Sequence, residues 1–290
     1  MKLLVIVIAL LSDRYLMHAL SSRRFIWFPN YAKWVSKRMP AHVTPNQYPW
    51  LYLLLIILPL LLIVGFVLGV ANVFLWGLFC WPLHFFIFYY CLGPNNPFYP
   101  CVETGEKVPA VHTAETADLE QAPVNLDNIT TFPSEILHKA EDKNMIEDKQ
   151  AMACYFSDVN GALFAVIFWY IVAGPLGVLF YRLVALTSSK VSEAANISAD
   201  LVALFDWIPA RITAIFYLLV GNFQRGIRWV IEQFFSVPAN NATFLSQTGL
   251  LAVRSNEKDI LSMPDAENLV WHAVILCLTL LAGFTLMAWL

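Results

Sequence analysis

The sequence predicts an all-α, polytopic membrane protein, and three observations support this. Hydrophobic residues make up 59% of the chain and charged residues only 13%, about half the charged share of typical soluble domains. No Asp, Glu, Lys or Arg occurs between Met39 and Val102. Several apolar stretches reach the roughly 20 residues that a helix needs to cross the hydrocarbon core. We therefore expect one membrane domain, 1–290, with five to six transmembrane helices and a long acidic loop.

Five spans are expected after the first fifty residues. Trp50–Leu92 is long enough for two of them, and the other three are Gly161–Leu186, Ser198–Gly221 and Leu269–Leu290. Gly69–Asn72 is expected to form the tight turn between the first two, and the Ser198 span crosses as one helix bent at Pro209. The N-terminus supplies the sixth. It resembles a signal-peptide core, but Asp13 and Arg14 stand where a cleavage site would follow, so a helix over Leu3–Leu20 is expected.

Charge placement predicts the orientation. Ser21–Tyr48 carries five basic residues and no acid, which favours the cytoplasm by the positive-inside rule. With six spans both termini then lie outside, and Asn222–Asn268 and the loop Gly93–Asn160 lie in the cytoplasm. The same count places the residues that follow the Gly161 span on the outer face.

The loop over 93–160 is the largest polar segment, with twelve acidic residues, four lysines and a net charge of −8. Gly93–Phe132 is expected to be irregular, and Ser134–Phe156 has the composition of a helix with a ragged apolar stripe. This helix either leads, solvated, into the next span or docks a protein partner. The negative charge disfavours nucleic acid and anionic lipid there.

The polar residues of the last long spans are few. The apolar run Gly161–Leu183 has Tyr181 and Arg182 near its end, and the next apolar run contains the motif Asp206-Trp-Ile-Pro-Ala-Arg211. Arginine costs roughly 2.5–3.5 kcal/mol at the centre of a membrane helix, so these arginines are expected at a boundary or in a paired interior site. In a helical hairpin the four side chains would meet and could hold an anion. The alternative is that the arginines reach the headgroups and Asp206 caps the next helix.

Four residues are expected to shape these helices: Gly174, Pro175, Gly177 and Pro209. A Gly-Pro pair inside a span requires either a kink or a close helix contact. We predict a packing role for them. No catalytic or metal-binding residue is predicted, because the cysteines and histidines show no ligand spacing.

The pattern F-x-x-x-F-W, G-P-x-G and Y-R over Phe164–Arg182, followed by D-W-I-P-A-R-I, resembles the AmpE family. These are bacterial inner-membrane proteins associated with β-lactamase induction. AmpE in turn resembles the CobD/CbiB family, which makes adenosylcobinamide phosphate in cobalamin synthesis and carries a similar P-A-R-L element. The specific match covers about Gly161–Gly221, and Asp13-Arg14 fits less specifically. The resemblance implies a multi-pass protein of the bacterial inner membrane.

Three functions remain open. The first is a regulatory or signalling protein of the AmpE type, without a cofactor. The second is an ATP-dependent enzyme of the CobD/CbiB type that joins an aminopropanol unit to a corrinoid acid. The third is a transport or structural accessory protein. The first is favoured, because SSRRFIWFPNYAKWV stands in place of the H-P-V-R element of the cobalamin family. Only Asp158, Asn160 and Gly161 remain of that family's acidic and amide pattern.

Overall fold

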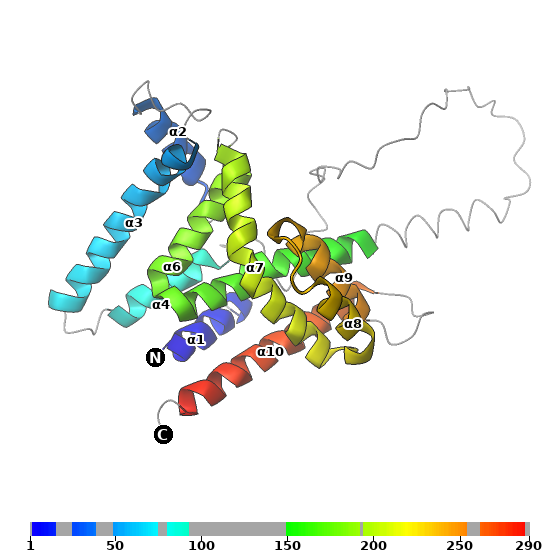
Figure 1. Ribbon diagram of the computed structural model, residues 1–290. Coiled ribbons are helices and arrows are strands. Elements are labelled where there is room, and N and C mark those ends of the chain that lie inside the picture. The colour runs from blue at the N-terminus through cyan, green and yellow to red at the C-terminus, as the bar shows by residue number, and fades with distance from the viewer. Residues whose placement is uncertain are drawn as a thin grey trace, which may run out of the picture. The chain divides into compact units, whose positions relative to one another are not determined.

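The computed structural model describes residues 2–15, 25–38, 49–74, 80–92, 149–191, 194–253 and 262–287. All regular secondary structure in these ranges is helical. The elements are α1 (Lys2–Tyr15), α2 (Phe28–Arg38), α3 (Pro49–Phe74), α4 (Cys80–Cys91), η2 (Asn160–Phe164), α6 (Ala165–Lys190), α7 (Ala195–Val220), α8 (Phe223–Gln233), η4 (Pro238–Asn240), α9 (Asn241–Val253) and α10 (Met263–Met287). Residues 149–159 are also helical and continue into η2 (Figure 1).

Four helical stretches are long and apolar enough to cross a membrane: Trp50–Asn72, Lys149–Lys190, Ala195–Val220 and Met263–Met287. The all-helical membrane architecture expected from composition is therefore present. The described parts of α1 and α4 have 14 and 12 residues, or about 21 and 18 Å of helix. Both are shorter than the hydrocarbon core of about 30 Å. By length the described residues therefore supply four spans, and the predicted count of five to six is not confirmed.

The turn predicted at Gly69–Asn72 is wrong. Helix α3 continues without interruption from Pro49 to Phe74, through Pro59 and Gly69. A single glycine does not end a helix in apolar surroundings, where each backbone N–H and C=O that leaves the helix has no water to bind. Residues 80–91 are consequently too few to cross by themselves.

The predicted loop 93–160 ends in a helix, as expected for the described end of Ser134–Phe156. Residues 149–159 form the start of the helical run that continues to Lys190. The remainder of the predicted loop, 93–148, lies outside the described residues, as does the end of the expected Leu3–Leu20 helix.

Aromatic residues build the core around α6 and α7. The Tyr217 ring lies 5.3 Å from the Phe156 ring and 6.0 Å from the Phe164 ring, centroid to centroid. Phe88 of α4 packs on Tyr170 of α6 at 4.7 Å. These rings are buried, and they connect the helix before the Gly-Pro pair to both of its neighbours.

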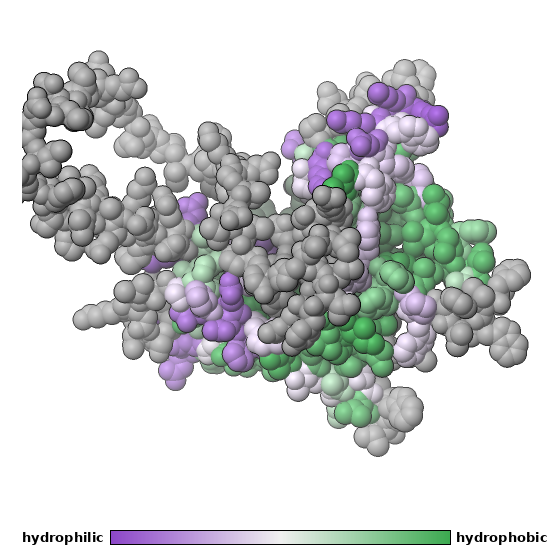
Figure 2. Space-filling view, turned by 180° about the vertical axis from the view of Figure 1, so that it is seen from behind, coloured by the Kyte–Doolittle hydropathy of each residue, from purple (hydrophilic) through white to green (hydrophobic). Residues whose placement is uncertain are grey.

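The outer face of α3 is apolar and exposed. Its exposed large side chains include Leu54, Leu58, Leu62, Phe66 and Val70. In Figure 2 hydrophobic residues cover this side of the molecule, and hydrophilic residues gather where α2 lies. This distribution is what a helix in contact with lipid requires.

Candidate functional site

The chain kinks sharply within α6. Gly174 has φ 70° and ψ −160°, a backbone conformation that essentially only glycine adopts. At Gly177 a side-chain carbon would collide with Cβ of Ala173 and lie 3.3 Å from the carbonyl oxygen of Trp169. The two glycines therefore permit a change of direction that Figure 1 shows as the angle between the halves of the 149–190 run.

The kink brings distant residues together. Twenty residues separate Gly161 from Tyr181, about 30 Å in a straight helix, yet the Tyr181 hydroxyl lies 3.4 Å from the carbonyl oxygen of Gly161. Both halves also flank α7, because the Phe205 ring contacts Trp169 at 5.2 Å and Phe180 at 5.5 Å. The second half of α6 thus folds back beside the first.

Tyr181 and Asp206 form the polar contact of this hairpin. The buried Tyr181 hydroxyl on α6 donates a 2.7 Å hydrogen bond to Oδ1 of Asp206 on α7. Arg182, the next residue of α6, is also buried, with 7% of its surface exposed. The structure therefore brings Tyr181 and Asp206 together at the hairpin, and Arg182 adjoins them along the chain.

Arg211 has a different environment. All five N–H groups of its guanidinium donate to protein acceptors. Nε binds the Phe234 carbonyl at 3.0 Å, Nη1 binds the Trp207 carbonyl at 3.1 Å and Oδ1 of Asn241, and Nη2 binds the carbonyl and hydroxyl of Ser236, each at 3.0 Å. The same group lies 4.6 Å from the Trp207 ring centroid and 4.8 Å from that of Phe244. Arg211 fastens the segment between α8 and α9 to α7.

Two more contacts support this attachment. Nε1 of Trp207 donates to the Ser236 carbonyl at 3.0 Å, and Nδ2 of Asn241 donates to the Ala203 carbonyl at 2.7 Å. Asp206 and Arg211 are five positions apart on α7, about 140° around its axis. The D-W-I-P-A-R motif thus serves two clusters, one with α6 and one with the α8–α9 segment, and α7 runs through the buried Pro209 between them.

The sequence interpretation did not select one buried polar pair. Oγ1 of Thr213 donates to Oδ1 of Asn160 at 3.0 Å, and both side chains are buried. Asn160 opens η2, a π-helical turn, and such turns are frequent at functional sites. Asn160 was noticed only through the family resemblance. Nothing in the sequence around Thr213 indicates a polar contact, because its position opposite Asn160 depends on how the helices pack.

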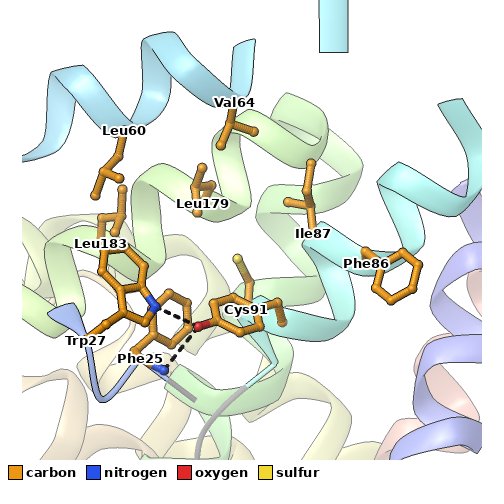
Figure 3. Close-up of a pocket in the computed structure, with 10 residues that line it drawn as sticks. Phe25, Trp27, Leu60, Val64, Phe86, Ile87, Cys91, Leu179 and Leu183 are labelled. Carbon is orange, nitrogen blue, oxygen red and sulfur yellow. Dashed lines mark hydrogen bonds between the residues drawn. The ribbon is translucent and has the colours of Figure 1, made fainter. Parts of the chain in front are cut away.

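Contacts with α3 show on which side of the molecule the connection between α6 and α7 lies. Near the start of α3 the Tyr31 hydroxyl of α2 donates to the Ile56 carbonyl at 3.1 Å. Further along, Leu60 faces Leu183 and Val64 faces Leu179 (Figure 3), so α3 and the second half of α6 are antiparallel. The connection between α6 and α7 consequently lies on the same side as α2. The prediction from charge placement put this connection on the side of the membrane opposite the basic segment. It assumed that each span crosses as a straight helix, and a kink within a span changes the side on which the span ends.

No group of three or more His, Cys, Asp or Glu side chains that could hold a metal ion occurs in the part of the chain that the structure describes. Of the predicted anion-site residues, Tyr181 and Asp206 are in contact, Arg182 follows Tyr181 in the chain, and Arg211 belongs to the other cluster.

Comparison with known proteins gives partial support to the resemblance. No family model and no solved structure matches the chain. Among curated proteins it is similar to the cobalamin biosynthesis protein CobD of Stutzerimonas stutzeri (strain A1501), with 34% identity over 76 residues. That match covers 24% of this chain and 25% of the relative, so the chain spans about a quarter of the curated protein it matches. Similarity to CobD is thus found in part of the chain, and the comparisons give no support to the AmpE assignment.

Proposed function

We propose that the chain is a regulatory membrane protein of the AmpE type, acting in the bacterial inner membrane in β-lactamase induction or a cell-wall-linked antibiotic response. The observation that supports this proposal is that every N–H group of the Arg211 guanidinium is hydrogen-bonded within the protein, which leaves none for a substrate anion. An arginine that binds a phosphate or carboxylate directs a fork of N–H groups at it. Here all five N–H groups bind the protein's own carbonyl, amide and hydroxyl oxygens.

In this proposal the polar residues transmit a signal by holding the helices in one arrangement. Tyr181, Arg182 and Asp206 receive a small anionic or polar ligand, and Arg211 fixes the α8–α9 segment that such a signal would move. The bilayer surrounds the helices, and the acidic segment 93–148 is the proposed contact for a protein partner. No cofactor is needed.

The second candidate is an amide-forming enzyme similar to CobD/CbiB, and two observations favour it. The first is the 34% identity to a CobD protein. The second is the side on which the α6–α7 connection lies. If α2 is cytoplasmic, as its basic residues predict, this connection faces the compartment that contains ATP, whereas the sequence-based orientation placed it on the outer face.

Complementation separates the candidates. The gene is deleted in its host, and β-lactamase induction is measured with the wild-type chain, Asp206→Asn and, as the control, Asp200→Asn at an exposed position of the same helix. The regulatory proposal expects induction to change on deletion and to be restored by wild type and Asp200→Asn only. Unchanged induction would contradict it.

The same variants are tested in a strain that lacks its adenosylcobinamide-phosphate enzyme. Restored cobalamin synthesis, together with saturable ATP and corrinoid binding that Asp206→Ala abolishes, would establish the enzymatic candidate. A chain inactive in both assays would favour the third possibility, a structural or transport accessory protein.

A further inference from the structure

We propose that the apolar cavity between α3, α4 and α6 holds one acyl chain of an anionic phospholipid, whose headgroup is bound by the basic side chains of α2. This site is separate from the Tyr181–Asp206 cluster, and its occupancy does not depend on the function proposed above.

The cavity has a volume of about 280 Å³, just below the range of about 300–1,000 Å³ for small-molecule sites. Its walls are aliphatic on two sides, with Leu60 and Val64 from α3 facing Leu179 and Leu183 from α6 (Figure 3). The third wall comes from α4 and includes Ile87. A hydrocarbon chain is the ligand that such a lining accommodates without leaving a polar group unpaired.

A rim of aromatic residues lies at one end of the cavity. The Tyr90 hydroxyl accepts hydrogen bonds from Nε1 of Trp27 at 2.8 Å and from the backbone N–H of Phe25 at 3.3 Å, drawn as dashed lines in Figure 3. Phe25 has φ 62°, the left-handed region that bulky residues avoid, and its ring packs on Tyr90 at 4.4 Å. Backbone strain of this kind persists where surrounding contacts enforce it. Tryptophan and tyrosine favour the boundary between lipid tails and headgroups.

Positive charge follows directly after the rim. Lys33 and Lys37 are exposed and one helical turn apart on α2, and Arg38 stacks 4.1 Å from the Trp34 ring centroid. The six residues from Trp27 to Lys33 cover about 9 Å along a helix axis. A headgroup layer is roughly 5–8 Å thick, from the difference between the whole bilayer and its hydrocarbon core. A lipid whose tail enters at the rim therefore presents its phosphate to Lys33.

Charge complementarity selects the occupant. The segment Ser21–Tyr48 contains no acidic residue, so nothing in it opposes a phosphate. The sequence predicts this segment on the cytoplasmic side, where the leaflet carries anionic lipids that attract basic segments. The adjoining face of α3 is exposed and apolar (Figure 2), so a lipid can enter from the bilayer without crossing a polar surface.

A second cavity provides a matched control. It has a volume of about 300 Å³, is also apolar, and is lined by residues of η2, α6, α7 and α10, among them Phe168, Ile212 and Leu281. None of the described residues that line it is basic. The described residues that line the first cavity also include no basic residue. The two cavities are alike in size and apolar lining, and they differ in that the first includes Trp27, directly before the basic helix α2.

The test is native mass spectrometry of the purified full chain in a mild detergent with equal amounts of phosphatidylglycerol and phosphatidylethanolamine. Three variants are compared with wild type: Leu179→Trp, which fills the first cavity, the exposed pair Lys33→Gln with Lys37→Gln, and Leu281→Trp, which fills the second. We expect one retained phosphatidylglycerol per chain, reduced at least fivefold in the first two variants and unchanged in the third.

Equal retention of the two lipids would overturn the proposal. So would an equal loss in all three variants, or a dimer mass without lipid, which would mean that a second copy covers the cavity. The lysine pair is on the surface, so the test remains decisive even if Leu179→Trp fails to fold.

Discussion

At the scale of single residues, Arg211 shows how a charged side chain is kept inside an apolar helix bundle. Only 3% of the surface of Arg211 is exposed, and each N–H group of its guanidinium has a hydrogen-bond acceptor. The sequence could identify Arg211 as exceptional, because charged residues are rare in membrane spans. Apart from the Trp207 carbonyl four positions earlier, the sequence could not identify the acceptors, because Phe234, Ser236 and Asn241 lie more than 20 positions away.

Arg211→Lys tests this attachment. A lysine has three N–H groups on one nitrogen, so at least two of the five acceptors lose their donor, at a cost of about 1–3 kcal/mol each where they are buried. We expect a clearly lower midpoint of thermal unfolding in detergent. Arg228→Lys is the control, since Arg228 is exposed and pairs with Glu232 at 2.9 Å, a contact expected to contribute about 0–1 kcal/mol. Equal midpoints for the two variants would contradict the structural role of Arg211.

Tyr181→Phe removes the hydroxyl that bridges α6 to Asp206 and keeps the ring. The Asp206 carboxyl group then loses its 2.7 Å donor, and we expect a loss of about 1–3 kcal/mol in the free energy of unfolding. The double variant with Asp206→Asn should lose less than the sum of the two single variants, because both remove the same contact. Strictly additive losses would show that the two side chains do not interact.

At the scale of elements, the kink in α6 decides the architecture. The sequence indicated that Gly174-Pro175 needs a backbone accommodation, but both a kink and a close helix contact fitted the pattern. The choice depends on packing, since Phe205 of α7 must fit between Trp169 and Phe180. The same reasoning explains the error at Gly69, where a Cβ would meet nothing within 4 Å, so no neighbouring helix requires a bend at that residue.

Gly174→Ala should be destabilising, because its φ of 70° and ψ of −160° are costly for any residue with a Cβ, by about 1–3 kcal/mol. Gly69→Ala is the matched control. Gly69 is inside α3, and a Cβ there meets nothing within 4 Å, so alanine should leave stability equal or slightly higher. Unfolding midpoints of the two variants in detergent decide the comparison. A loss in Gly69→Ala as large as that in Gly174→Ala would show that any added methyl group is harmful.

At the scale of the whole molecule, the orientation of the helices gives a prediction that labelling can check. In a background without native cysteines, Lys37→Cys on α2 and Lys190→Cys at the end of α6 should react with an impermeant maleimide from the same side. Asn72→Cys, near the far end of α3, should react from the opposite side, because α3 is long enough to cross. Labelling of Lys37→Cys and Lys190→Cys from opposite sides would show that the second half of α6 does not return toward α2.

The sequence by itself determined the all-helical membrane class, the approximate positions of the four long spans, and the small set of polar residues within them. These follow from composition and local length, since a run of apolar residues must form a helix wherever water is excluded. The tertiary structure alone decided that the chain doubles back at Gly174, that Tyr181 meets Asp206 while Arg211 binds the α8–α9 segment, and that the hairpin connection lies on the side of α2. Each of these depends on contacts between residues distant in the chain. Packing selects such contacts from several arrangements that have the same hydrophobic pattern.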